Sequence, residues 1–143
     1  MNTKASSFSK DHHVDVLFVD DSPNLRRTMQ LWFQTKGYSV LTCESADEAE
    51  QMAAASPPGM MITDLGLPDR SGYALLKTLR QSEALSQTYF VAFSGDTLEQ
   101  EKARALEAGF DCFLRKPPDF DVLSKLLETR LRRQSDGDAV VAN

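Results

Sequence analysis

Five polar side chains in this sequence are of types that bind divalent cations and phosphoryl groups. Each follows a short apolar run that predicts a β-strand: Asp20 and Asp21 follow the first run, Asp64 the third, Ser94 the fourth and Lys116 the fifth. The carboxyl ends of neighbouring parallel strands meet at one edge of a sheet, where ligands bind. We therefore expect these five side chains to converge.

Asp20, Asp21 and Asp64 would repel one another at this edge, and they should not all stay ionised at neutral pH without a cation. Oxygen ligands with access to water suit Mg²⁺ or Mn²⁺ rather than Zn²⁺. The ammonium group of Lys116 and the hydroxyl group of Ser94 can each bind a phosphoryl oxygen. Because a carboxylate can also attack phosphorus, the set predicts metal-assisted phosphoryl chemistry.

Each residue also has an ordinary structural interpretation when it is taken alone. Acidic residues such as Asp20 and Asp21 are favoured at a helix N-terminus by the helix dipole. Asp64 and Ser94 can be turn residues, and Lys116 can be a surface residue before a Pro-Pro turn. The functional interpretation depends on all of these residues occurring in order, each at a predicted strand end.

The elements that must position these residues alternate along the chain. Apolar runs predict strands at residues 14–19, 38–42, 60–63, 89–93 and 112–114, and helical patterns follow at about 23–36, 46–56, 72–81, 96–108 and 120–131. Strands with nearly continuous apolar runs favour a parallel sheet that is covered on both faces. Five βα units with right-handed crossovers favour a single doubly wound, flavodoxin-like α/β domain with strand order 2-1-3-4-5.

Helix signals at two positions support this reading. Ser22 followed by Pro23 is typical of an N-cap and a first helical residue. Ser45 and Glu48 have the spacing of a capping box, in which each side chain satisfies a backbone N–H of the other residue. Trp32 lies in phase with the apolar positions of the first helix, so we expect its side chain to be mostly buried.

Composition narrows the class of protein. The 143 residues suit one domain, which we expect at 13–133, with flexible tails at 1–12 and 134–143. The 16 Lys and Arg residues against 21 Asp and Glu give a net charge of −5, which argues against direct binding to nucleic acid or to an anionic membrane. No apolar run is long enough for a membrane span, and two distant cysteines form no disulfide framework, so a cytoplasmic location is expected.

Four segments of the chain resemble the signature segments of the response-regulator receiver family of two-component signalling. They read VLFVDDS, MITDLGLPDRSG, VAFSG and FDCFLRKPP, and the resemblance covers roughly residues 13 to 133. It implies a chemotaxis-regulator-like domain that a histidine kinase or histidine phosphotransfer protein phosphorylates on an aspartate. Phosphorylation would change the conformation and act on a downstream protein target. The resemblance also implies a monomer or a weak phosphorylation-dependent dimer. Such a domain is not an enzyme in the ordinary sense, because it transfers the phosphoryl group to itself and dephosphorylates slowly.

The resemblance also implies a metal site and an acceptor. Asp64 is similar to the phosphoacceptor of the family. Asp20 and Asp21 are similar to the acidic pair that binds Mg²⁺ or Mn²⁺ together with Asp64, with Asp21 as the more direct ligand. Gly66 stands where the family supplies a backbone carbonyl to the metal. Gly66 has no side chain to shade the phosphorus, which leaves the lifetime of the phosphoryl group open.

Further matching positions imply a phosphoryl clamp and a switch. Ser94 and Lys116 are similar to the pair that contacts the phosphoryl group, and Ser94 also moves in the switch. Phe113 stands at the position of the rotating aromatic residue, without the hydroxyl of a Tyr. We expect Phe113 to lean inward even before phosphorylation. The family often has a cis peptide at the bond that precedes Pro117. The sequence departs from the family at Gly95, where Ala is common.

Two other functions remain open from the residues alone. A phosphatase of the haloacid dehalogenase type also uses a strand-end Asp and Mg²⁺, but Ser22 occupies the place of its second Asp. A flavodoxin-like cofactor binder needs a phosphate-binding loop where Asp20 and Asp21 stand. Within the receiver interpretation, the domain could act alone, shuttle phosphoryl groups in a phosphorelay, or form part of a hybrid kinase.

Overall fold

The computed structural model describes residues 13–96 and 98–131. A five-stranded parallel sheet has the order β2-β1-β3-β4-β5, which confirms the expected doubly wound α/β fold. The strands are β1 (Val16–Val19), β2 (Val40–Cys43), β3 (Met60–Asp64), β4 (Tyr89–Ser94) and β5 (Cys112–Arg115). The helices are α2 (Pro23–Thr35), α3 (Ala46–Ala55), α4 (Gly72–Leu79), α5 (Glu99–Ala108) and α6 (Phe120–Arg130), with a short 3₁₀ helix η1 (Glu83–Leu85).

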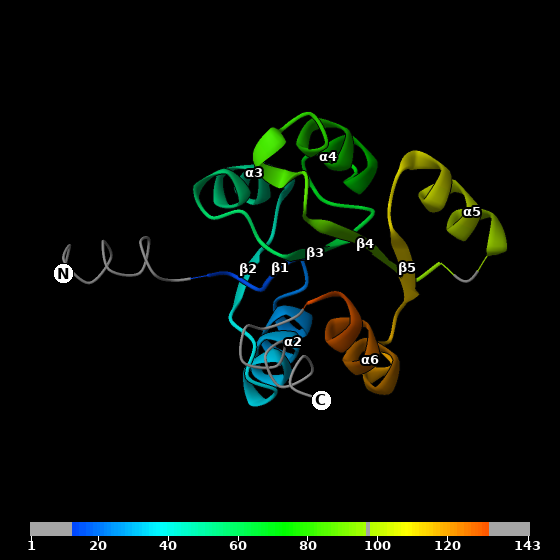
Figure 1. Ribbon diagram of the computed structural model, residues 1–143. Coiled ribbons are helices and arrows are strands. Elements are labelled where there is room, and N and C mark those ends of the chain that lie inside the picture. Colours follow the sequence, from blue (N-terminus) through cyan, green and yellow to red (C-terminus); the bar gives the residue numbers. More distant parts are fainter. Residues whose placement is uncertain (1–12, 97, 132–143) are drawn as a thin grey trace.

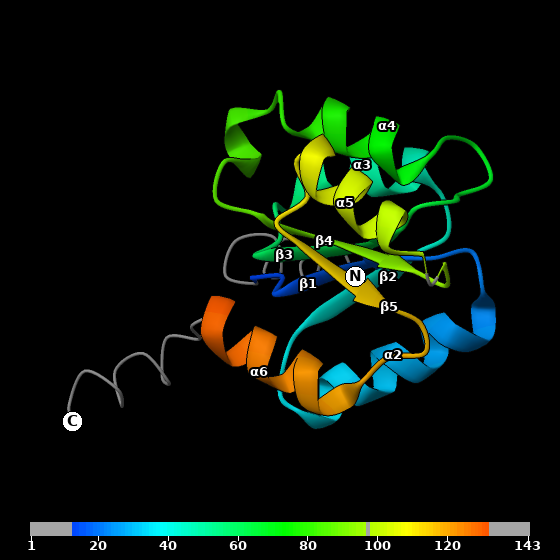
Figure 2. The ribbon, with the colours of Figure 1, turned by 90° about the vertical axis from the view of Figure 1, so that its right-hand side faces the viewer.

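Helices cover both faces of the sheet. Figure 1 and Figure 2 show α3, α4 and α5 on one face and α2 and α6 on the other. Successive strand side chains point to opposite faces, so Leu17 and Met61 pack under the first layer while Phe18 and Ile62 pack against the second. The strands read as continuous apolar runs because both of their faces are buried.

Side-chain caps begin two helices where the sequence predicts them, with one difference. The Ser22 hydroxyl accepts a hydrogen bond from the N–H of Leu25 at 3.2 Å, and Ser45 does the same for Glu48 at 3.2 Å. The Glu48 carboxylate, however, accepts from the N–H of Glu44 at 3.0 Å rather than from that of Ser45. The capping box was therefore predicted correctly for its first half only.

Helix α5 begins later than its sequence pattern predicts. It starts at Glu99 rather than near 96, because the Asp96 carboxylate accepts the N–H of Leu98 at 2.8 Å and holds a turn before the helix. The other end is as expected: Gly109 follows the helix with φ 115°, a conformation that favours glycine.

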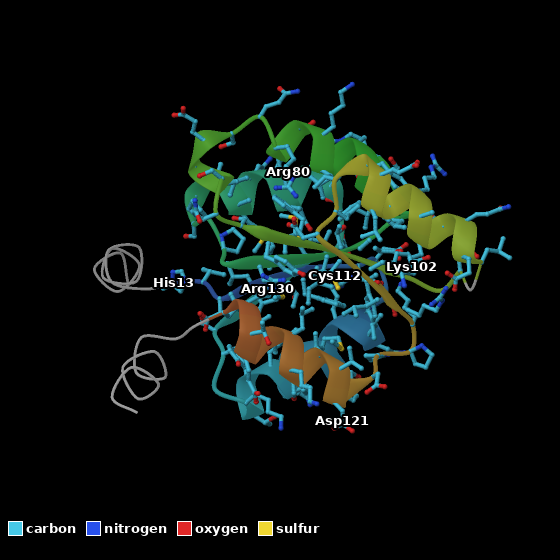
Figure 3. All side chains as sticks on the ribbon, turned by 45° about the vertical axis from the view of Figure 1, so that its right-hand side comes forward. His13, Arg80, Lys102, Cys112, Asp121 and Arg130 are labelled. Atoms are coloured by element: carbon cyan, nitrogen blue, oxygen red, sulfur yellow. The ribbon has the colours of Figure 1, made fainter. Side chains whose placement is uncertain are left out.

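Trp32 and the cysteines lie close to their expected positions. Trp32 is partly buried and packs its ring against Phe33 and Phe120. Cys43 and Cys112 are free thiols on the two opposite edge strands of the sheet, and Figure 3 labels Cys112 on β5 between the helix layers.

Residues 1–12 and 134–143, the expected tails, lie outside the described residues. Within the described ranges, no helix combines the length and apolar character needed to cross a bilayer.

Candidate functional site

Strand register brings the predicted site residues to one edge of the sheet. Val19 of β1 pairs with Thr63 of β3, so Asp20, the next residue after Val19, lies beside Asp64. On its other side Asp64 pairs with Phe93 of β4. The carboxylate of Asp64 therefore stands at the centre of the sheet edge, between the ends of β1 and β4.

Three carboxylates gather at this point. One oxygen atom from each of Asp20, Asp21 and Asp64 lies within 4.8 Å of the other two. Asp20 is fully buried, Asp64 is half-buried and Asp21 is exposed. The cluster is thus open to solvent on one side, and its carboxylate oxygens are of the type that Mg²⁺ and Mn²⁺ prefer.

Lys116 directly follows β5, an edge strand of the sheet, and its side chain reaches this cluster. Its Nζ atom lies 2.7 Å from Oδ2 of Asp20 and 3.6 Å from Oδ1 of Asp64. The side chain crosses the end of β4, with Nζ 5.5 Å from the ring centroid of Phe93. A single ammonium group is therefore shared between the most buried carboxylate and the central one.

Asp20 is held firmly by its surroundings. Besides the ion pair with Lys116, its Oδ1 atom accepts the N–H of Ser22 at 2.9 Å. Its backbone carbonyl accepts a hydrogen bond from the guanidinium group of Arg26 at 2.8 Å. Each oxygen of the buried carboxylate thus has a partner, as a buried charged group requires.

Asp64 is less completely compensated. Burial raises the pKa of the Asp64 carboxyl above its ordinary value, and the charges of Asp20 and Asp21 add to this effect. The ammonium of Lys116 and the N–H of Gly66, which donates to Oδ1 at 3.3 Å, act in the opposite direction. The net rise in pKa means that the ionised form of Asp64 would gain from additional positive charge.

The remaining candidate residues surround Asp64 in different states. Gly66 is exposed, and a Cβ atom added to it would meet nothing within 4 Å. The hydroxyl group of Ser94 is buried and accepts the N–H of Asp96 at 3.0 Å, so it is bound to its own loop rather than to Asp64. The ring of Phe113 is 9% exposed and belongs to the core under α5.

The peptide bond between Lys116 and Pro117 is cis. The backbone N–H of Lys116 donates to the carbonyl of Ser94 at 2.8 Å, which joins the ends of β4 and β5 beyond their last paired residues. Ser94 and Lys116, the two residues that could contact a phosphoryl group, are therefore joined by a backbone hydrogen bond.

Sequence reasoning missed three residues that shape the site. Arg26 contacts the backbone of Asp20 from the second turn of α2. Asp69 and Arg70, in the loop after Asp64, contact helix α3. No periodic pattern marks these residues, because Arg26 binds a carbonyl outside its own helix and the partners of Asp69 and Arg70 lie at least 20 positions away in the chain.

Known proteins resemble the chain in sequence. A model of the response regulator receiver domain matches residues 16–128. The chain is 34% identical over 120 residues to the transcriptional regulatory protein KdpE of Mycobacterium tuberculosis, and 31% identical over 129 residues to the virulence transcriptional regulatory protein PhoP of Salmonella typhimurium. These matches cover 84% and 90% of this chain but 52% and 56% of the relatives, so the chain spans about half of their length.

Solved structures resemble the fold over most of the chain. The chemotaxis response regulator CheY4 of Vibrio cholerae superposes with a TM-score of 0.76 at 27% identity, covering 83% of this chain and 99% of that one. A response regulator receiver protein from Pseudomonas putida gives 0.74 at 31% identity, covering 82% and 97%. The chain belongs to the family of response regulator receiver domains of two-component systems.

Proposed function

We propose that this receiver domain accepts a phosphoryl group on Asp64 from a histidine kinase or a histidine phosphotransfer protein. The observation that carries the proposal is the shared ammonium group. Lys116 bridges a fully buried carboxylate and a central carboxylate that is open to solvent and has a raised pKa. Of the site carboxylates, Asp64 is the one that combines solvent access with contact to this cation.

Asp20, Asp21, Asp64 and the backbone carbonyl of Gly66 would hold Mg²⁺ or Mn²⁺ in this proposal. The grouped oxygens and the excess of negative charge at the sheet edge fit such an ion. When bound, the ion supplies positive charge that offsets the charge of the carboxylates and of the phosphoryl oxygens.

The chain's own residues would perform the transfer as follows. A carboxylate oxygen of Asp64 forms a bond to phosphorus while the bond from phosphorus to the donor nitrogen breaks, and the electron pair of that bond stays on the donor imidazole. Lys116, already 3.6 Å from Asp64, binds one phosphoryl oxygen. Ser94 binds another after its hydroxyl leaves the N–H of Asp96.

Movement of Ser94 would then act as the switch. If the loop after β4 moves toward Asp64, it leaves space beside β5, where the ring of Phe113 already packs inward. Phe113 has no hydroxyl group to leave unpaired in the buried position. We therefore expect the phosphorylated state to be recognised mainly on the face formed by α5, β5 and α6, by a downstream protein target.

The donor would approach beside Pro117 and Pro118. An apolar cavity of about 240 Å³ opens there between α2, α6 and the sheet, with Met29, Phe93 and Val122 among its lining residues. Val122 is 47% exposed, so apolar surface continues out of the cavity. This surface adjoins Lys116 and supports docking of a donor protein on α2 and the loop after β5.

The wider role follows the family. Two of the curated relatives are named transcriptional regulatory proteins, and this chain spans about half of their length. The net charge of −5 favours contact with proteins rather than direct contact with nucleic acid. We propose a cytoplasmic signalling role, as a regulator acting alone, as a phosphorelay shuttle or as one part of a hybrid kinase. The phosphatase alternative has no support: the family match is to receivers, and Ser22 serves as the N-cap of α2.

The test is phosphorylation by acetyl phosphate in the presence of Mg²⁺, followed by intact-protein mass measurement. One base-labile phosphoryl adduct is expected on the wild-type protein and none on Asp64→Asn. Asp111→Asn is a matched control, because Asp111 lies at the opposite end of the sheet and contacts Arg80 and the N–H of Phe90. Labelling of Asp64→Asn at the wild-type rate would contradict the assignment of the acceptor.

A further inference from the structure

Asp69 caps helix α3 from outside that helix. Its Oδ1 atom accepts the N–H of Ala46 at 2.9 Å and its Oδ2 atom accepts the N–H of Asp47 at 2.9 Å. The helix's own N-cap, Ser45, uses its hydroxyl for the N–H of Glu48 and so does not compete. These bonds, that of Ala46 first, hold the pKa of the Asp69 carboxyl below its ordinary value. The loop after β3 is therefore fastened to the first turn of α3.

Arg70 extends the same contact by one turn. Its guanidinium group lies 2.8 Å from the Asp47 carboxylate and 3.2 Å from the Glu50 carboxylate. Asp47 and Glu50 are three residues apart and so lie on one face of α3. Figure 1 shows α3 and α4 side by side on the same face of the sheet, with this loop leading into α4. Two adjacent residues of opposite charge thus bind two turns of one helix.

The loop itself is short and closed, so its tip and its base move together. The N–H of Gly72 donates to the carbonyl of Leu65 at 2.9 Å, and Gly66 forms an antiparallel bridge with Ser71. A Cβ atom added to Gly72 would come within 2.6 Å of the carbonyl oxygen of Asp64. A displacement of the tip of this loop would therefore also displace Gly66 and Asp64.

The turn between β2 and α3 also contacts the other carboxylate segment. The N–H of Asp20 donates to the carbonyl of Cys43 at 3.0 Å. Arg26, which binds the carbonyl of Asp20, lies 3.6 Å from the Glu44 carboxylate. Residues 43–47 thus touch both segments that carry the clustered oxygens, although none of these residues belongs to the cluster.

We propose that Asp69 and Arg70 are positioning residues for the phosphoryl site. By binding helix α3, they fix the position of the loop that carries Gly66 relative to Asp20 and Asp21. The inference rests on the proposed function. The turn between β2 and α3 acts as the common support from which the spacing between the two ligand-bearing segments is set. Removing the contacts of Asp69 or Arg70 with α3 should weaken metal binding without removing any of the oxygens that bind the metal.

The test compares Mg²⁺ affinity with stability in the whole chain. For Asp69→Ala we expect the Kd for Mg²⁺, measured by titration calorimetry well below the Tm, to rise roughly three- to tenfold. This is at or below the low end of the effect of changing residues that bind metal ligands directly, because Asp69 acts through the backbone of its loop. Asp69→Asn keeps one acceptor oxygen, so its Kd for Mg²⁺ should lie between that of the wild-type protein and that of Asp69→Ala. Phosphorylation by acetyl phosphate should be slow at limiting Mg²⁺ and return to the wild-type rate at saturating Mg²⁺.

Asp111→Ala is the matched control. Like Asp69, Asp111 is a loop carboxylate that accepts a backbone N–H, but it lies at the opposite end of the sheet and also contacts the guanidinium group of Arg80. The proposal is overturned if Asp69→Ala lowers the Tm and leaves the Kd unchanged, or if Asp111→Ala raises the Kd equally. Arg70→Ala provides a second variant if Asp69→Ala does not fold. If the wild-type protein binds no Mg²⁺, the proposed function itself fails, and this inference fails with it.

Discussion

Buried polar groups have different kinds of partner at the two ends of the parallel sheet. At the amino end, Asp15 accepts the N–H of Ser39 at 2.8 Å, and the hydroxyl of Thr88 donates to the carbonyl of Pro58 at 2.7 Å. Each polar group there is paired by a nearby group, over a tightly packed core. At the carboxyl end, three carboxylates converge and one ammonium group contacts two of them.

Missing hydrogen bonds do not account for this difference. Within residues 13–96 and 98–131, no buried side-chain nitrogen or oxygen lacks a hydrogen-bond partner. What separates the two ends is the clustering of like charge: at the carboxyl end three carboxylates lie within 4.8 Å of one another, an arrangement that a bound cation would stabilise. Changes at the carboxyl end should therefore alter ligand response, and changes at the amino end should alter stability alone.

The largest effect is expected for Lys116→Met. This change leaves the Asp20 carboxylate, whose side chain is 1% exposed, without its cationic partner. Removing one partner of a buried ion pair costs about 3 kcal/mol in free energy of unfolding. The rate of phosphorylation should also fall about a hundredfold or more, because one contact to the transferred group is lost. Urea unfolding in EDTA and timed labelling with acetyl phosphate measure the two effects. A stability loss near zero would show that Asp20 is not held by this pair.

Asp21→Ala should act on stability in two directions. The wild-type protein should gain about 2.7 kcal/mol at a Mg²⁺ concentration of roughly a hundred times Kd, and the variant should lose this gain. Without metal, the variant should be more stable than the wild type, because a like charge is removed. Since Asp21 is exposed, that second effect should stay below about 1 kcal/mol. Thermal unfolding with and without Mg²⁺ separates the two, and an unaltered Mg²⁺ response would remove Asp21 from the site.

At the amino end, Thr88→Val should lower stability without touching ligand response. The change leaves the carbonyl of Pro58 unpaired in a buried place, which costs about 1 to 2 kcal/mol. The increase in Tm produced by Mg²⁺ should be the same in the variant and in the wild-type protein. A changed Mg²⁺ response in this variant would break the distinction between the two ends of the sheet.

Five βα units with right-handed crossovers favoured the sheet order that the structure has. The residues at the carboxyl edge of the sheet could be predicted for a separate reason. Apolar runs such as that of β1 report burial on both faces, and a polar residue directly after such a run must lie at the sheet edge. Other features depend on partners that are distant in the chain. The contact between Asp69 and α3 links residues 23 positions apart, and the start of α5 depends on how Asp96 turns the chain. Local patterns carry no record of either.

Tyr73 offers the smallest effect and tests whether a polar contact in the helix layer behaves like the complete amino end. Its hydroxyl donates to the Glu101 carboxylate, joining α4 to α5, and the guanidinium group of Arg104 lies 4.5 Å from its ring centroid. Burial first, and then the bond to Glu101, raise the pKa of Tyr73 to about 12. We expect Tyr73→Phe to lower the free energy of unfolding by about 1 kcal/mol at neutral pH, with an unchanged response to Mg²⁺.

The sign of the pH dependence follows from the raised pKa. A tyrosine whose folded pKa lies above its unfolded value of about 10 contributes stability that is fully present below pH 10 and is lost as the pH rises toward 12. Free energies of unfolding measured in urea from pH 8 to pH 11 should therefore fall less steeply for Tyr73→Phe than for the wild-type protein. The pKa of Tyr89 is also raised, mainly by burial, so the comparison is made cleanest in a Tyr89→Phe background. Equal slopes with and without the Tyr73 hydroxyl would show that neither burial nor the bond to Glu101 holds the phenol neutral. The contact between α4 and α5 would then differ from the self-contained pairs at the amino end of the sheet.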